Sequence, residues 1–301
     1  MDAKRRDVGS MLKPRPLVSV VIPTFGRPKY LADTLASIAT QTYENIECIV
    51  VDDHSDPPVE IPAHAGLDVQ LLRHARNLGP GAARNTGLAH ATGDLLLYLD
   101  DDDLITERRI EWAVRDMGDA RMHACRSAYF DAMGNVTEDQ RVFDGDLRAT
   151  FNRARGPAMG QVVYRREDCL QFDTSLRVAE DTEWWIRMAD HAVFSWTDHL
   201  GHLVRTHSDP RAGVSEAVRY QCRMYSLRRH ERTARVDAQS LARLRRDVGA
   251  AALRADQRAR AAWWAARSLT ARPSLRAVKI MARAAIPRSH NRSDDPRQPI
   301  G

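Results

Sequence analysis

Four short apolar runs in the first hundred residues predict buried β-strands. They occupy residues 17–22, 46–51, 69–72 and 94–99. Each run is rich in valine, isoleucine and leucine and lacks polar alternation, which is typical of strands covered on both faces of a sheet. Helical spacing follows the first run, from Pro28 to about Thr40, and precedes the fourth, from Gly79 to Ala91. Strands that alternate with helices predict a parallel sheet with its ligand crevice at the carboxyl ends of the strands.

The pattern changes after residue 120 and divides the rest of the chain. Two strand-like runs between Arg121 and Phe143 predict a hairpin around Gly134. A short helix is expected from Asp181 to His191 and a strand from Ala192 to Trp196, and the chain is rich in alanine and arginine with helical spacing from Val214 to Ile286. We therefore expect four parts: a flexible lead-in over 1–15, an α/β domain over 16–212, a helical C-terminal extension over 213–287 and a disordered tail over 288–301.

Composition favours an ordinary globular protein with acidic partners. The chain has 301 residues, of which 43% are hydrophobic and 28% are charged, and this balance argues against disorder as the main state. The formal net charge is +5, carried mainly by arginine toward the C-terminus. Such a balance suits nucleotide phosphates, nucleic acid or an anionic membrane surface. No recognised nucleic-acid module is found, so nucleic acid is not expected as a partner.

Cysteine spacing and the shortness of the apolar runs favour a reduced, cytoplasmic protein. Cys48, Cys125, Cys169 and Cys222 lie far apart and without the paired spacing of zinc or redox motifs, so we expect reduced core residues. No apolar run reaches the length of a signal-peptide core or the roughly 18 residues of a membrane-spanning helix. The basic C-terminal helices leave two interpretations open: a cap packed on the α/β domain, or peripheral contact with the inner face of the membrane.

Polar segments with ligand-binding chemistry stand where the predicted strands end. Asp52 and Asp53 follow the second strand, where a carboxylate can accept a hydrogen bond from a base N–H such as uracil N3. A turn or helix-cap aspartate is the alternative. The tract from Asn77 to Gly87 offers small residues for close backbone approach and Arg84 to neutralise a phosphate. Its alternative is tight helix–sheet packing beside a solvated arginine.

Four consecutive aspartates, Asp100 to Asp103, follow the fourth strand. Magnesium and manganese prefer oxygen ligands, and they commonly take few protein carboxylates while substrate phosphates complete the coordination shell. Two aspartates at alternate positions suit this need, so the sequence predicts a divalent cation, Mn²⁺ or Mg²⁺. A solvated acidic run is the alternative, although adjacent like charges repel one another when no cation is present.

The order of these segments closely resembles glycosyltransferase family 2 over roughly residues 17–210. The matching segments are Pro23 to Arg27, Val51 to Ser55, Asn77 to Gly87, Leu99 to Asp103, and Glu180-Asp181 followed by Trp184-Trp185 and Arg187. The resemblance implies the GT-A fold, in which helices flank a Rossmann-like and mostly parallel central sheet. It also implies an inverting, metal-assisted transfer of a sugar from a nucleotide diphosphate to an acceptor hydroxyl.

The resemblance assigns roles to the matched residues. The donor-binding residues would be Pro23, Thr24, Arg27, Asp52, Arg84 and Asp100. The metal ligands would be Asp100 and Asp102, and His207 of an Arg205-x-His207 pair would approach the metal or the diphosphate. Asp181 matches the family's catalytic base, while Glu180, Trp184 and Trp185 would lie on the acceptor side. Taken alone, a carboxylate pair there also suits a helix N-terminus, and adjacent tryptophans are also typical of a core.

The predicted activity is the transfer of a single sugar from a nucleotide-diphosphate sugar, with a UDP-sugar as the expected donor. The acceptor would be a glycan, a lipid-linked glycan or a small molecule. A processive enzyme is not expected, because the Gln-x-x-Arg-Trp motif and membrane helices of the family's polymerases are absent. Two alternatives remain: a GT-A-like protein that binds nucleotide sugars without turnover, and a nucleotidyltransferase. The latter would be expected to carry a glycine-rich basic loop at the place of Pro23 to Arg27.

Overall fold

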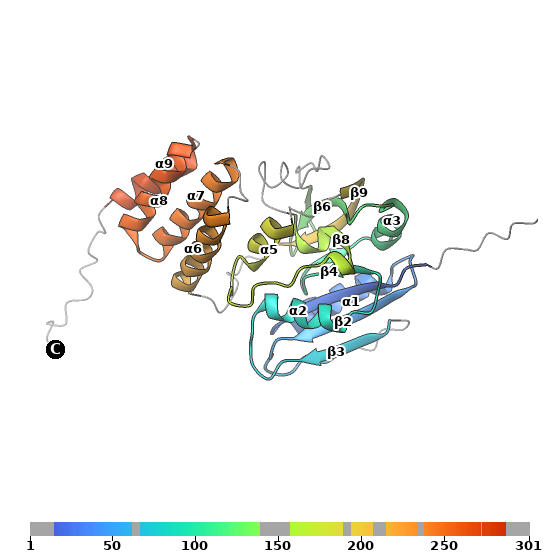
Figure 1. Ribbon diagram of the computed structural model, residues 1–301. Coiled ribbons are helices and arrows are strands. Elements are labelled where there is room, and N and C mark those ends of the chain that lie inside the picture. The colour runs from blue at the N-terminus through green and yellow to red at the C-terminus, as the bar shows by residue number, and fades with distance from the viewer. Residues whose placement is uncertain are drawn as a thin grey trace, which may run out of the picture. The chain divides into compact units, whose positions relative to one another are not determined.

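The chain divides into two compact units, residues 1–212 and residues 213–301 (Figure 1). The computed structural model describes residues 15–61, 67–138, 157–188, 194–206, 215–233, 238–271 and 273–286. The first unit contains the α/β sheet and every segment with candidate chemistry. The second consists of helices in its described residues, and each unit is considered by itself.

A nine-stranded sheet, in the order β3-β2-β1-β4-β8-β6-β9-β5 with β7 beside β6, forms the first unit. The strands are β1 (Val18–Thr24), β2 (Ile46–Asp52), β3 (Val69–Arg73), β4 (Leu95–Tyr98), β5 (Leu104–Ile105), β6 (Met122–Phe130), β7 (Val136–Glu138), β8 (Val162–Arg165) and β9 (Phe194–Arg205). The helices are α1 (Pro28–Ala39), α2 (Pro80–His90), α3 (Arg109–Asp116) and α5 (Glu180–Met188), with 3₁₀ turns η1 (Met159–Gln161) and η2 (Arg166–Asp168). The predicted α/β class is confirmed.

The sheet is parallel only over its first half. Strands β3, β2, β1 and β4 run parallel, as the alternation of strands and helices predicts. Beyond β4 the sheet is mixed, because β8 pairs antiparallel with both β4 and β6. The predicted hairpin around Gly134 is found as the antiparallel pair of β6 and β7. A parallel pair requires a crossover connection, whereas hairpins and irregular segments bring in the antiparallel strands of this half.

Close packing of helices on β1 fixes the place of the candidate site. All seven residues of β1 are buried, and α1 covers the sheet with Leu31, Leu35 and Ile38. Helix α2 lies so near that a Cβ added to Gly87 would stand 2.2 Å from Cγ1 of Val21. Only glycine permits this approach without a shift of the strand or the helix. The tight helix–sheet packing that the sequence left open is therefore real at Gly87.

The carboxyl ends of three strands meet at one edge of the sheet. Thr24 at the end of β1 pairs in register with Asp52 at the end of β2. Val21 pairs with Tyr98, the last residue of β4. Thr24 lies three residues after Val21, and the aspartate run lies two to five residues after Tyr98, so the two are side by side. The register therefore brings residues 24, 52 and 100–103 to the same edge.

Four consecutive helices make up the described part of the second unit. They are α6 (Glu216–Thr233), α7 (Ala238–Arg254), α8 (Arg258–Ala271) and α9 (Leu275–Ala285), and each packs on the next. Gly249 of α7 allows close contact with Ala261 and Trp264 of α8. Alanines fill much of this core, which brings the helix axes near one another. Within the described residues, no helix is both long and apolar enough to cross a membrane.

Candidate active site

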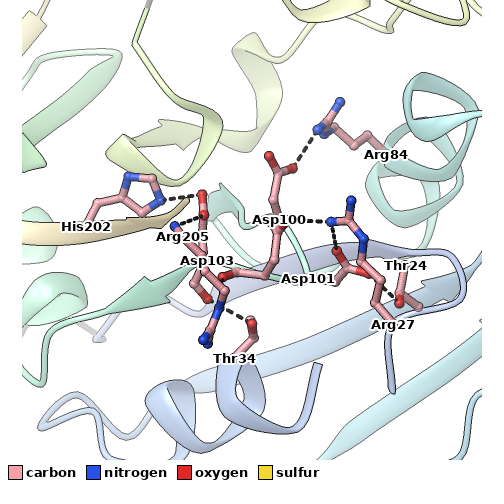
Figure 2. A network of polar contacts seen from close by, with 10 residues as sticks. Thr24, Arg27, Thr34, Arg84, Asp100, Asp101, Asp103, His202 and Arg205 are labelled. Carbon is pink, nitrogen blue, oxygen red and sulfur yellow. Dashed lines mark hydrogen bonds and ion pairs between the residues drawn. The ribbon is translucent and has the colours of Figure 1, made fainter. Parts of the chain in front are cut away.

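The aspartate loop that follows β4 is buried and held by polar contacts. Asp101 is only 6% exposed, and its Oδ2 accepts a hydrogen bond of 2.7 Å from Oγ1 of Thr24. The Arg27 guanidinium forms ion pairs with Asp101 and Asp102 (Figure 2). Burial raises the pKa of Asp101 to about 7, although the hydrogen bond from Thr24 opposes the rise and the charge of Asp102 adds to it. Two carboxylates of the loop, those of Asp101 and Asp102, therefore share the positive charge of Arg27.

Strand β9 holds the far end of this loop. The buried His202 lies with Nε2 3.0 Å from Oδ2 of Asp103, and the backbone N–H of Arg205 donates to the other oxygen at 3.1 Å. The Arg205 Nε also donates to the carbonyl oxygen of Asp102 at 3.0 Å, while its guanidinium lies over the rings of Tyr30 and Phe130. Figure 2 shows His202 and Arg205 reaching Asp103 from the same strand. The backbone at residues 102 and 103 is thus fixed from outside the loop.

Three carboxylates of the loop could hold a divalent cation. One oxygen from each of Asp100, Asp102 and Asp103 lies within 4.8 Å of the other two. All three donors are hard oxygens, which suits magnesium or manganese. Asp103 is already engaged by His202 and Arg205, whereas the side chain of Asp100 is 33% exposed. The donor set fits a cation, and Asp100 is the most exposed of the three, since Asp102 and Asp103 are only 5% and 4% exposed.

Arg84 connects the aspartate loop with the start of α5. One terminal nitrogen donates to Oδ1 of Asp100 at 2.7 Å, and the other donates to Oε1 of Glu180 at 3.0 Å. The residue is only 4% exposed. The guanidinium is thus buried and shared by two carboxylates of the chain, and its contact with a donor phosphate stays a prediction. Its position couples two acidic motifs that lie far apart in the sequence.

The two acidic residues that begin α5 have different surroundings. Glu180 is buried against Arg84, and burial, together with the charge of Asp181, raises the pKa of its carboxyl group. Asp181 is exposed, and its Oδ1 accepts the backbone N–H of Thr182. Ala179, just before them, has a left-handed φ of 63°, a conformation that is costly for residues other than glycine and is common at functional sites. Asp181 is thus the solvent-exposed carboxylate of this pair.

The two tryptophans of α5 belong to the core. Trp184 is 0% and Trp185 1% exposed, which favours the core interpretation that the sequence left open, and their place on the acceptor side stays a prediction. The Trp184 ring stacks on Phe172 with centroids 5.0 Å apart, and its Nε1–H donates to the carbonyl oxygen of Leu170. Helix α5 buries both rings because it must cover the sheet next to Tyr164.

The aspartates that follow β2 serve their own loop. Asp52 is 1% exposed and accepts hydrogen bonds from the backbone N–H groups of Ser55 and Val59 and from Arg73. Burial alone would raise the pKa of Asp52, but these hydrogen bonds outweigh it and lower the pKa. Asp53 accepts the N–H groups that precede α2, those of Leu78 and Gly79, at 2.7 Å each. Both aspartates thus hold the turn after β2 and the start of α2, and the contact of Asp52 with a base stays a prediction.

Three other residues of the predicted motifs are Pro23, Gly81 and His207. Pro23 is buried within β1. A Cβ added to Gly81 would stand 3.2 Å from Cβ of Phe172 and 3.4 Å from Cγ of Glu180. The small residue at this position therefore makes room for two side chains of the chain itself. His207 lies outside the described residues. Sequence reasoning missed His202 as a group that holds the aspartate loop, and no local signal marks it, because its partner Asp103 is distant in sequence.

Breaking the Arg84 bridge should destabilise the first unit. Arg84→Ala would leave Asp100 and Glu180 without their buried partner, which typically costs about 3–5 kcal/mol. Urea unfolding of the full chain, followed by tryptophan fluorescence, would measure the loss, since the Arg84 guanidinium lies over Phe172 beside Trp184. Arg108→Ala is the matched control, because Arg108 pairs with Glu111 at the exposed surface and such pairs contribute little. Equal urea midpoints for both variants would contradict the bridging role.

Sequence comparison places the first unit among known glycosyltransferases. Residues 19–141 match the sequence model of the family described as Glycosyl transferase family 2. An uncharacterized glycosyltransferase of Rickettsia conorii is 29% identical over 182 residues, which are 57% of this chain and 30% of that protein. One of Haemophilus influenzae is 40% identical over 101 residues, 32% of this chain and 40% of that protein. The chain therefore spans well under two thirds of the length of the curated relatives it matches.

Comparison with solved structures extends the likeness to most of the chain. Staphylococcus aureus TarS 1–349 in complex with UDP-GlcNAc has a TM-score of 0.64 at 19% identity, over 89% of this chain and 88% of that one. The mannosyltransferase PcManGT from Pyrobaculum calidifontis, in complex with GDP-Man and Mn²⁺, has a TM-score of 0.55 at 21% identity, over 89% and 79%. At these identities the likeness concerns the fold, and the predicted GT-A fold is confirmed.

Proposed function

We propose that this chain, which is a glycosyltransferase family 2 protein through its residues 19–141, transfers a single sugar from a nucleotide diphosphate to an acceptor hydroxyl with inversion. The observation that carries the proposal is the Arg84 bridge. It joins Asp100 of the aspartate loop to Glu180, the neighbour of Asp181. A sugar whose diphosphate is held at the loop would thereby have an exposed carboxylate beside its reacting carbon.

Asp100 and Asp102 are the residues that would hold the divalent cation. When bound, the cation would neutralise the charge that develops on the departing diphosphate. Arg27 is a partly exposed cation at the aspartate loop, where its side chain pairs with Asp101 and Asp102. We infer that Arg27 turns toward the diphosphate when Asp102 binds the metal. Asp103 stays with His202 and Arg205 and keeps the loop in place.

Asp181 would be the general base. Inversion requires that the acceptor oxygen attack the anomeric carbon from the side opposite the leaving group, and that a carboxylate accept the hydroxyl proton. Asp181 is exposed at the first turn of α5, where a substrate hydroxyl can approach its carboxylate. Glu180 is unsuited to this role, because it is buried and bound to Arg84.

A uridine nucleotide is the donor that we propose. Its support is that a protein of like fold, TarS 1–349, is found in complex with UDP-GlcNAc and with UDP, while the GDP-Man complex of PcManGT makes a guanosine sugar the alternative. Because Asp52 is occupied by its own loop, we propose that the loop it organises, Ser55 and Arg73 included, meets the base. One hydrogen bond to the base contributes about 1 kcal/mol, which corresponds to roughly a fivefold preference for UDP over GDP.

Calorimetric titration with manganese present tests the donor and the activity together. UDP should bind at least about fivefold more tightly than GDP, and one or more UDP-sugars should release UDP in the presence of the chain. Asp52→Asn should weaken UDP binding while preserving binding of manganese. Tighter binding of GDP would move the donor to guanosine sugars, and failure of every nucleotide sugar to bind or react would contradict the proposed function as a whole.

A further inference from the structure

The positive charge of the chain resides in its second unit. Residues 213–301 contain 20 arginines and lysines against 7 aspartates and glutamates, a formal balance of +13, whereas the whole chain has +5. The first unit is therefore acidic, and the basic balance of the protein cannot be ascribed to nucleotide binding there. A separate anionic partner of the helices has to be sought.

Helices α8 and α9 carry only one sign of charge. From Gln257 to Ser293 the sequence contains no aspartate and no glutamate. The cations of the two helices are Arg258, Arg260, Arg267, Arg276, Lys279 and Arg283. Helices whose outer face only meets water usually intersperse both signs, because opposite charges along the surface stabilise one another. Arg258 and Arg267 of α8 form ion pairs with Asp256 and Glu231, which lie outside the two helices. The cations of α9 are therefore the ones best suited to a polyanion.

The outer face of α9 is divided into an apolar and a basic side. Ala277 and Ile280 face the helical core. Successive residues turn by about 100°, so Leu275, Ala282 and Ile286 lie on the opposite side with Val278 next to them. Leu275 is 82%, Val278 50% and Ile286 60% exposed. The cations of the helix follow along the other flank of this stripe: Arg276, Lys279 and Arg283, all of them exposed.

Helix α8 also carries an exposed aromatic side chain. Trp263 of α8 is 50% exposed, with the Arg267 guanidinium over its ring at 4.8 Å from the centroid. Helices α8 and α9 are neighbours, and Arg258 at the start of α8 donates to the carbonyl oxygens of Arg283 and Ile286 at the end of α9. Tryptophan and arginine are both favoured at the boundary between lipid head groups and acyl chains.

We propose that α9, supported by α8, lies on an anionic membrane surface, with the stripe Leu275, Val278, Ala282 and Ile286 inserted among the head groups. The flanking cations would meet the lipid phosphates. A nucleic acid would use the cations but would gain nothing from the aliphatic stripe. A second copy of this face would bring like charges together. A membrane surface uses both sides of the helix at once, as interfacial helices do.

Flotation of the full chain with lipid vesicles tests the proposal and does not depend on catalysis. The chain should bind vesicles of phosphatidylcholine with phosphatidylglycerol and should bind those of phosphatidylcholine alone far more weakly. Leu275→Glu with Val278→Glu should lower the partition coefficient by about tenfold or more, because it places charge in the stripe. Arg276→Gln with Lys279→Gln should lower it roughly fivefold for each cation removed. Both pairs are exposed, and circular dichroism would verify that the helices persist.

Met133→Glu with Val136→Glu is the matched control. These side chains are 87% and 56% exposed at the β6–β7 hairpin of the first unit, so the same change of charge and apolarity should leave vesicle binding unaltered. If the Leu275 and Val278 variant binds anionic vesicles as the native chain does, the proposal is wrong. It is also wrong if duplex DNA binds more tightly than the vesicles and with no dependence on the stripe, which would favour nucleic acid as the partner.

Discussion

Asp181→Asn should lower the rate of sugar transfer by about a hundredfold to ten-thousandfold and leave the affinity for the donor nearly unchanged. The amide keeps the size of the side chain and can still accept the N–H of Thr182, but it cannot take up a proton. Because the carboxylate of Asp181 is exposed and holds no distant residue among the described contacts, the substitution should not disturb the fold. Transfer rate and nucleotide affinity, measured side by side, separate the two effects.

Two further variants serve as controls for the Asp181→Asn experiment. Glu167→Gln removes another exposed carboxylate of the same unit and should change neither rate nor affinity. Glu180→Gln weakens the contact with Arg84 and should lower the urea midpoint, while a base at Asp181 would leave the form of the pH–rate profile intact. Native turnover in the Asp181 variant, or a loss of donor affinity equal to its loss of rate, would show that Asp181 is structural.

Asp102→Ala should abolish the stimulation of transfer by manganese or magnesium. A bound cation supplies several kcal/mol of charge stabilisation, so the expected loss is about a hundredfold or more. Titration calorimetry should also show weaker binding of manganese in the absence of any nucleotide, which makes the test independent of turnover. The physical reason is that Asp102 provides one of the three oxygens that lie within 4.8 Å of one another, and Asp103 is occupied by β9.

Asp119→Ala is the control for this substitution, since Asp119 is an exposed aspartate in the turn after α3. It should retain both metal stimulation and manganese affinity. Asp102→Asn retains the shape of the side chain and therefore shows whether the negative charge is needed. If Asp102→Ala responds to manganese as the native chain does, the cation is held elsewhere and the assignment of Asp100 and Asp102 fails.

The sequence by itself determined the strands that carry the site and the order of its motifs. Residues 17–22 and 46–51 are apolar runs interrupted only by Ser19 and Glu47, and a run of this kind has few options other than a buried strand. The aspartates that end the strands of a parallel sheet must then meet at one edge. The resemblance of the motifs to family 2 was likewise local, because each motif is a short contiguous segment that keeps its residue types.

Only the tertiary structure decided what each polar side chain contacts. Arg84 and Glu180 are separated by 96 positions, and Asp103 and His202 by 99, so no local pattern could reveal that they are paired. The contacts of Arg84 and Asp52 within the chain were also hidden from the sequence, and they form because a buried charge is stable only beside an opposite charge or several hydrogen-bond donors. The burial of the two tryptophans of α5 was likewise decided by the tertiary structure. Helical spacing gives the direction of a ring relative to its own helix and leaves open which surface covers it.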